Sequence, residues 1–272
     1  GWGDLHLYPL DAAKLGQLWL NGGVWNGTQV VSQGWVADSV RVHAKMGKDA
    51  GEDYGYGWHI PRQSSVGGEY AAVGRGGQEI RVFPALHGVV VTTAGGIDPS
   101  KATDLLAPAI VKPTTPLPPN PEGVAHLRET LAHLAAAPVA QPPLPLPAIA
   151  QAISGAIYAF GPNPLDLATL RLDFAQPTEA TMAITFNDGQ APRTVDIGLD
   201  GVYRLSPGRY GLPSAQRGTW TDGTTFVLEY NELANIDSYT FQMRFSGHAI
   251  TIDGQELTHS TAFQLAGASQ AG

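Results

Sequence analysis

Apolar residues recur at spacings of three and four in the first part of the chain. Over residues 10–21 this pattern predicts a helix that ends at Asn21-Gly22-Gly23 and whose apolar face is Leu10, Ala13, Leu15, Leu18 and Trp19. Ser32 is a suitable N-cap for a second short helix that runs to about Val40. Another helix is predicted over residues 100–111, which carry Leu105, Leu106 and Ile110.

The pattern between these helices is that of strands. Residues 53–60 alternate small and aromatic side chains, which predicts one strand. Residues 79–83 alternate polar and apolar side chains, and residues 89–93 are a continuous apolar run, so two more strands are predicted there. The cluster Gly74-Arg75-Gly76-Gly77 precedes them, and its glycines allow a close approach of the backbone to another group. By pattern alone, crowding between strands is favoured there over a ligand site.

Residues 113–151 are predicted to be a linker, because ten of the 21 prolines lie there and proline favours an extended path. One helix interrupts the linker: Asn120 caps it, Pro121 takes its first position, and it ends before Pro138. Its apolar face is expected to pack on a neighbouring domain and consists of Val124, Leu127, Leu131 and Leu134. His126 and His133 are interpreted as solvated rather than as metal ligands, since no carboxylate completes a ligand set.

Residues 152–272 carry short alternating runs about every ten residues, separated by turn signals such as Asn187-Asp188-Gly189 and Asp253-Gly254. This spacing predicts an all-β barrel or sandwich. A barrel of this size can hold a small apolar ligand, but the many aromatic residues favour an interior filled with side chains. Four arginines are expected to form ion pairs at the surface or at the barrel ends: Arg171, Arg204, Arg217 and Arg244.

Composition and charge limit the function further. The net charge of −8 argues against nucleic acid as a partner, since no basic field would neutralise phosphates. The chain has no cysteine, which excludes disulfides, thiolate zinc sites and cysteine nucleophiles. No apolar run reaches about 18 residues, so no membrane span is expected. Because the sequence begins at Gly1 without a methionine, we expect that processing or truncation has removed an upstream segment.

Five motifs of the first 112 residues occur in an order that resembles the C-terminal part of the serine β-lactamase-like hydrolases. They are Leu-Asn-Gly-Gly-Val-Trp-Asn-Gly, Val-Val-Ser-x-x-Trp-Val, Tyr-Gly-Tyr-Gly-Trp, Gly-Arg-Gly-Gly-Gln and Pro-x-Leu-x-x-Val-Val-Val-x-Thr-x-Gly. The resemblance is closest to the branch of class C β-lactamases, family VIII esterases and 6-aminohexanoate-dimer hydrolases. Residues 198–204 and 217–220 resemble, more weakly, the lipocalin-like barrel that follows the hydrolase domain in several members.

The resemblance implies an α+β fold with three regions. Residues 1–112 would be the rear of a hydrolase domain, in which an antiparallel sheet packs with helices. The linker of residues 113–151 and an accessory β-barrel of residues 152–272 would follow. The resemblance favours a periplasmic or secreted location and a small amide or ester as substrate, and it implies no cofactor and no metal.

The resemblance also assigns residues to a catalytic wall. Gly-Arg-Gly-Gly-Gln matches the third motif of these enzymes, so Arg75, Gly76 and Gly77 would line the pocket. The backbone N–H of Gln78 would form part of the oxyanion hole. Arg75 replaces the usual lysine or histidine, and a guanidinium can clamp a carboxylate but cannot exchange protons at neutral pH. Tyr56 and Trp58 are candidates for substrate contacts, although core packing is the favoured role of these aromatic residues.

The other two motifs of the family, Ser-x-x-Lys and Tyr-x-Asn, do not occur in this chain. We therefore expect it to lack a nucleophile and to be inactive alone. Three alternatives stay open: it is the rear of a longer enzyme, a non-catalytic binding module derived from one, or one piece of a cleaved enzyme. In each case, a half sheet would expose apolar surface, so a missing N-terminal half or a second chain is expected to cover residues 1–112.

Overall fold

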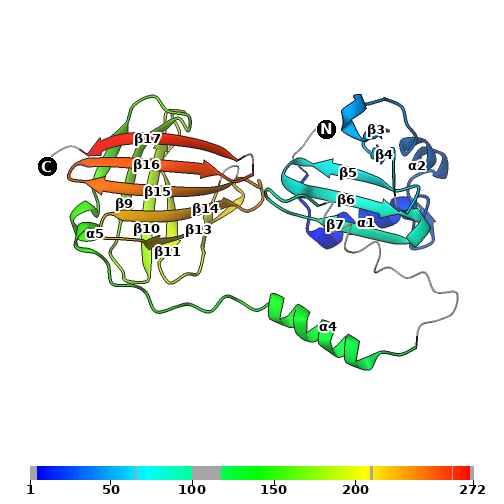
Figure 1. Cartoon of the computed structure of the whole chain (residues 1–272), viewed down its shortest axis with the longest axis horizontal. Helices are drawn as coiled ribbons and strands as arrows, with labels where there is room; N and C mark the ends of the chain where they lie inside the picture. The colour runs from blue at the N-terminus through cyan, green and yellow to red at the C-terminus, as the bar shows by residue number, and fades with distance from the viewer. Residues whose placement is uncertain (1–4, 65, 100–117, 209–210, 259, 270–272) are drawn as a thin grey trace. The chain divides into compact units, whose positions relative to one another are not determined.

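The computed structural model describes residues 5–64, 66–99, 118–208, 211–258 and 260–269. The chain consists of two compact units, residues 1–118 (unit 1) and residues 119–272 (unit 2), each with its own sheet (Figure 1). The division between the units lies inside the predicted linker. In the described ranges, no helix combines the length and the apolar character needed to cross a membrane.

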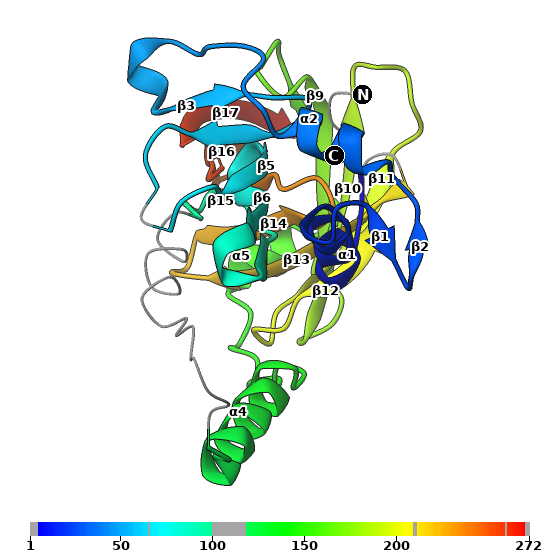
Figure 2. The same ribbon diagram turned by 90° about the vertical axis from the view of Figure 1, so that its right-hand side faces the viewer.

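Unit 1 is built on an antiparallel sheet of five strands in chain order (Figure 1). Its strands are β3 (Glu52–Tyr54), β4 (His59–Pro61), β5 (Tyr70–Gly74), β6 (Gln78–Phe83) and β7 (Gly88–Thr92). Helix α1 (Pro9–Leu20) packs on β6 and β7, and the short ladder of β1 (Val24–Trp25) and β2 (Thr28–Gln29) lies beside it (Figure 2). The remaining elements in the described residues of unit 1 are α2 (Gln33–Ser39) and the 3₁₀ turns η1 (Lys48–Ala50), η2 (Arg75–Gly77) and η3 (Pro84–Leu86).

Helix α1 buries only part of the predicted face, at Trp19, which packs against the core of unit 1. Leu10 is 80 % exposed, whereas Ala12 and Gly16 are buried. A Cβ at Gly16 would lie 2.5 Å from Cγ1 of Val89, so the missing side chain allows the helix backbone to approach β7 closely. This close approach, rather than the row of leucines, decides which face is buried. The predicted cap of α2 is confirmed, because Oγ of Ser32 accepts a hydrogen bond from the N–H of Trp35.

The single strand predicted over residues 53–60 is wrong, since β3 and β4 are separate strands of an antiparallel pair. The chain turns back between them, where the N–H of Gly55 donates to the carbonyl of Trp58 at 2.8 Å and Gly57 has φ +85°. Glycine permits that left-handed conformation without a steric cost. The helix predicted over residues 100–111 lies outside the described residues.

The core that the described residues of unit 1 form is small. Its buried cluster is Trp58, Tyr70 and Val82, against which partly buried residues of α1 and the sheet pack. The Trp58 ring lies edge-on to Tyr70, with centroids 5.0 Å apart, and burial raises the pKa of Tyr70 to about 12. The phenol therefore stays neutral and serves packing.

Unit 2 is a closed barrel, so the predicted barrel is confirmed. Nine strands form the ring in the order β11-β10-β9-β8-β17-β16-β15-β14-β13, and the parallel pair Gly198 and Arg217 joins β11 to β13. The strands are β8 (Ile157–Phe160), β9 (Leu167–Asp173), β10 (Glu179–Phe186), β11 (Arg193–Gly198), β13 (Pro213–Trp220), β14 (Thr225–Glu232), β15 (Ser238–Ser246), β16 (Ala249–Glu256) and β17 (Thr261–Ser269). Strand β12 (Arg204–Pro207), which the alternation did not predict, pairs with β13.

In the described part of unit 2, helices α4 (Pro121–Leu134) and α5 (Ala148–Ile153) precede the barrel. Helix α4 has the predicted cap, because Oδ1 of Asn120 accepts a hydrogen bond from the N–H of Gly123 at 2.9 Å. Its apolar face does not pack on the barrel of unit 2, since Val124, Leu127, Leu131 and Leu134 are all exposed. Helix α5 lies in the region predicted as linker, yet Ala150 and Ile153 are buried in the barrel core.

Candidate functional site: a cavity in the barrel

One end of the barrel is filled with aromatic rings. Phe226 is fully buried, and its ring centroid lies 5.3 Å from that of Phe174 and 5.2 Å from that of Trp220. A Cβ at Gly218 would overlap the Phe226 ring, so glycine is needed on β13 for the ring to lie there. Helix α5 lies at this end of the barrel. Ser154, which directly follows α5, accepts at its Oγ a hydrogen bond from the N–H of Phe174.

The other half of the barrel is not filled, contrary to the favoured prediction. It contains a cavity of about 270 Å³. Its wall is mostly aliphatic and aromatic, and it consists of Pro164, Leu165, Leu167, Leu170, Met182, Ile184, Phe186, Arg193, Leu228, Tyr230, Glu232, Asp237, Tyr239, Phe241, Met243, Ile252 and Leu265. The presence of the cavity depends on how side chains from seven strands and two loops share the interior, which the alternating pattern does not specify.

A stack of rings forms one wall of the cavity. Tyr239 and Phe241 are stacked with centroids 5.6 Å apart, and Phe263 meets Phe241 edge-on at 6.1 Å. Between them lies Gly254, where a Cβ would overlap the Phe263 ring. A side chain at Gly254 would therefore displace the Phe263 ring, which packs on Phe241 of this wall.

Three polar side chains meet at the cavity wall at the ends of β11 and β14. Nη1 of Arg193 donates to Oη of Tyr230 at 3.2 Å and to Oε1 of Glu232 at 3.4 Å. Oη of Tyr230 donates to the same carboxylate oxygen at 3.2 Å. Burial, and then the negative charge of Glu232, raise the pKa of Tyr230, so the phenol remains a neutral donor.

A second polar group extends this cluster along β13. Gln216 lies directly across from Tyr230 and is fully buried, and its Nε2 donates to Oγ of Ser214 at 2.7 Å. In the described part of the chain, Oε1 of Gln216 has no hydrogen-bond partner. An unsatisfied buried acceptor lowers the stability of the fold. With Gln216, this half of the barrel contains buried polar groups in addition to the cavity.

The predicted ion pairs of the barrel are confirmed for all four arginines. Arg171 pairs with Asp173 at 2.5 Å, Arg204 with Asp200 and Glu179 at 2.9 Å each, Arg217 with Glu229 at 2.9 Å, and Arg244 with Asp253. The sequence interpretation missed Arg193, which is the arginine that lines the cavity. Its inward position at the start of β11 could have been found from alternation, since Val195 and Ile197 on the same face are buried.

In unit 1, the structure explains the predicted glycine motif by the approach of another backbone segment. Gly76 and Gly77 have φ +77° and +97°, and a Cβ at Gly77 would lie 2.6 Å from the carbonyl oxygen of Ile97. The carbonyl of Gly76 accepts a hydrogen bond from the N–H of Gly96 at 2.9 Å. The side-chain amide of Gln78, the first residue of β6, donates to the carbonyl of Ala94.

The other predicted site residues lie in separate clusters. Arg75 is exposed at the surface of η2. Trp58 is 6 % exposed and packs against Trp19 and Tyr70, which is the core role favoured for it. Tyr56 is 48 % exposed and its ring stacks on that of His43 with centroids 3.9 Å apart. The catalytic and substrate-binding roles of these residues stay predictions.

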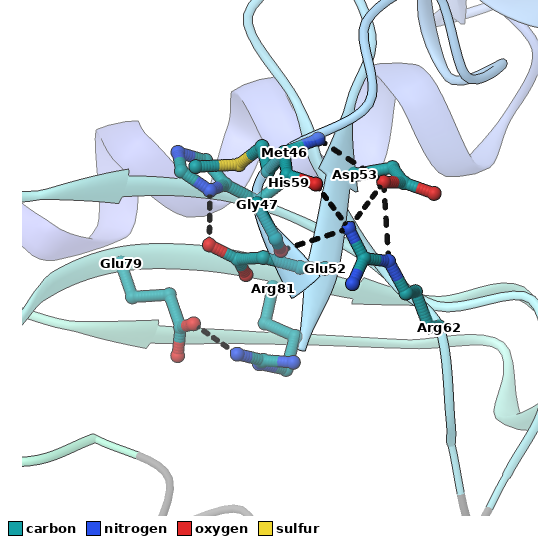
Figure 3. Close-up of polar contacts among 8 residues, drawn as sticks. All are labelled: Met46, Gly47, Glu52, Asp53, His59, Arg62, Glu79 and Arg81. Carbon is teal, nitrogen blue, oxygen red and sulfur yellow. Dashed lines mark hydrogen bonds and ion pairs between the residues drawn. The ribbon is translucent and has the colours of Figure 1, made fainter. Parts of the chain in front are cut away.

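Polar contacts join the loop before β3, the edge pair of β3 and β4, and residues of β6 in unit 1 (Figure 3). Nη2 of Arg62 donates to Oδ1 of Asp53 at 2.8 Å and to the carbonyl of Met46 at 2.6 Å, which fixes the loop before β3. The hydrogen bond from Arg62 lowers the pKa of Asp53. Figure 3 also shows Nδ1 of His59 beside Oε1 of Glu52, at 2.7 Å, and an ion pair of Arg81 with Glu79.

Among the residues that the structure describes, no group of three or more His, Asp or Glu side chains is placed so that it could hold a metal ion. His126 and His133 both lie on the exposed helix α4.

Comparisons with known proteins give no assignment. No protein family and no curated protein matches the sequence. The solved structures that are similar at low level include the following three. Secretory abundant heat soluble protein 4 from Ramazzottius varieornatus is 8 % identical, with 38 % of this chain and 69 % of that one covered and a TM-score of 0.32. The fatty-acid-binding protein isolated from Manduca sexta is 14 % identical, with 44 % and 99 % covered and a TM-score of 0.33. A luciferase domain from the dinoflagellate Lingulodinium polyedrum is 14 % identical, with 85 % and 84 % covered and a TM-score of 0.29. At these TM-scores the likeness carries no argument about function.

Proposed function

We propose that unit 2 is a binding domain for a small, mostly apolar molecule. The observation that carries this proposal is the cavity of about 270 Å³ in one half of the barrel. Apolar walls with a few convergent polar groups are typical of small-molecule sites. The volume equals that of about nine molecules of liquid water, which suits a ligand of on the order of ten non-hydrogen atoms. We include in this proposal that the barrel is lipocalin-like, as the sequence resemblance at residues 198–204 and 217–220 implies.

A substitution that fills the cavity tests the binding function. Ile184 lines the cavity from β10 and is buried. Replacing it with tryptophan adds a ring to the cavity, so binding of 1-octanol measured by calorimetry should weaken at least tenfold. Leu205→Trp is the matched control, because Leu205 is exposed on β12. Equal binding by both variants and the unchanged chain would place the octanol elsewhere and contradict the proposal.

A second candidate function follows from the hydrolase resemblance, and it concerns unit 1. We propose that β5, η2 and β6 form the wall of a serine-hydrolase pocket whose nucleophile comes from another segment or chain. The turn at Gly76 and Gly77, which puts Gln78 at the start of β6, supports this proposal. Among the described residues of unit 1, the small core and exposed apolar residues such as Leu10 and Val73 support a missing partner that covers this unit.

The chain alone should not hydrolyse a chromogenic ester, since it lacks an activated serine. The measurement is the release of p-nitrophenol from p-nitrophenyl acetate by the purified chain, compared with the same reaction in buffer. Gln78→Pro, which removes the candidate oxyanion N–H, should leave that background rate unchanged. Turnover above the background that disappears in Gln78→Pro would show that the chain carries its own catalytic site.

A further inference from the structure

The cavity has a polar end and an apolar interior, so it can orient its ligand. Arg193, Glu232 and Asp237 line it where β11 begins and β14 leads into β15. The deeper wall is formed by side chains such as Leu170, Met182 and Met243. A ligand with one apolar chain would bury that chain among these residues and leave its polar group beside Arg193.

The charges at the polar end select among head groups. The described residues that line the cavity include one guanidinium and two carboxylates. The guanidinium of Arg193 already lies against the carboxylate of Glu232, with the Tyr230 hydroxyl bridging them. A ligand carboxylate would lose water of hydration and would lie near the carboxylates of Glu232 and Asp237. A ligand ammonium would also lose water of hydration and would lie near the guanidinium of Arg193. Both burials are costly because like charges repel more strongly in a partly buried site than in water.

Arg193 nevertheless has hydrogen-bond donors to offer. A guanidinium carries five N–H donors. Within the described ranges, the hydrogen bonds of Arg193 use only Nη1, and its charge also lies over the Phe186 ring, 5.5 Å from the centroid. The remaining N–H groups suit a carbonyl or hydroxyl oxygen, which accepts hydrogen bonds without bringing a net charge into the site.

We infer that the cavity takes an uncharged amphiphile, an amide, ester or alcohol of about ten non-hydrogen atoms, whose polar oxygen accepts hydrogen bonds from Arg193. This inference rests on the proposed binding function and adds the class of ligand. It predicts that free carboxylates of the same length are rejected, although an arginine lines the site.

The test compares four probes of equal chain length on the unchanged chain at pH 7: octanamide, 1-octanol, octanoate and octylammonium. Calorimetry should give octanamide and 1-octanol dissociation constants at least about tenfold lower than those of octanoate and octylammonium. Absence of binding by all four probes would overturn the binding function itself. Octanoate or octylammonium binding as tightly as octanamide would overturn the inference about the ligand class and leave the binding function standing.

Two variants identify the groups responsible. Glu232→Gln removes one carboxylate and should reduce the difference between octanamide and octanoate at least about threefold. Arg193→Gln should weaken octanamide about tenfold, because charge-assisted donors are lost. Arg244→Gln is the matched control, since Arg244 is half exposed and pairs with Asp253 away from the cavity lining. If circular dichroism shows that a variant is unfolded, the four-probe series on the unchanged chain still decides the inference. Unchanged octanamide affinity in folded Arg193→Gln would contradict the role of Arg193.

Discussion

Replacing Phe226 with alanine should lower the free energy of unfolding of unit 2 by about 3–5 kcal/mol. The ring is fully buried at the filled end of the barrel, between Phe174 and Trp220. It also lies over Gly218, which has no side chain to move into the space that the ring would leave. A large cavity at this end would cost both the transfer free energy of the ring and its packing contacts.

The measurement is urea unfolding of the full chain, followed by circular dichroism in the near ultraviolet. Leu205→Ala is the control, because Leu205 is 68 % exposed on β12 and its loss should change stability by no more than about 0.5 kcal/mol. A loss below about 1 kcal/mol for Phe226→Ala would mean that the filled end tolerates a void, and that the barrel is not closed by packing there.

Replacing Gly77 with alanine should destabilise unit 1 by at least about 2 kcal/mol. Two causes add. The backbone at Gly77 has φ +97°, which L-residues avoid, and the new Cβ would lie 2.6 Å from the carbonyl oxygen of Ile97. The carbonyl of Gly77 also accepts a hydrogen bond from Oγ1 of Thr92 at 2.8 Å, so the turn cannot move without breaking a contact to β7.

Limited proteolysis and hydrogen exchange of unit 1 measure this effect separately from unit 2. Gly88→Ala is the matched control, since Gly88 also adjoins β6 but has open space around its Cα. Protection of β5, β6 and β7 should fall in Gly77→Ala and remain in Gly88→Ala. Equal protection in the two variants would contradict the structural role of the turn.

The strands of the barrel could be predicted because each presents alternate residues to a buried interior, as in Ala180, Met182 and Ile184 on β10. Strand β12 could not, since Arg204–Pro207 is short and its Leu205 points to solvent. Helix α5 was missed because a run of prolines immediately precedes it, although Ile153 is buried in the barrel. The local pattern of apolar and polar residues does not predict which segments outside the regular strands pack against the barrel.

The candidate site was harder to predict than the strands. Aromatic content predicted a filled interior, and the rings do fill one end, but Tyr239 and Phe241 stack along the wall and leave the space beside them open. The partners of Arg193 lie more than 35 residues away on β14, so sequence spacing could not identify them. In unit 1 the glycine motif is explained by the approach of Ile97, and its catalytic role rests on the resemblance alone.

The methionines of this chain test the central claim most directly. Of the three, Met182 and Met243 line the cavity, whereas Met46 lies in unit 1. The full chain with ¹³C-labelled methionine methyl groups is titrated with octanamide and followed by NMR. We predict that the Met182 and Met243 signals shift in a saturable way while the Met46 signal stays in place. Unchanged signals of Met182 and Met243 at saturating probe, or a shift of Met46 alone, would contradict a ligand site in the barrel.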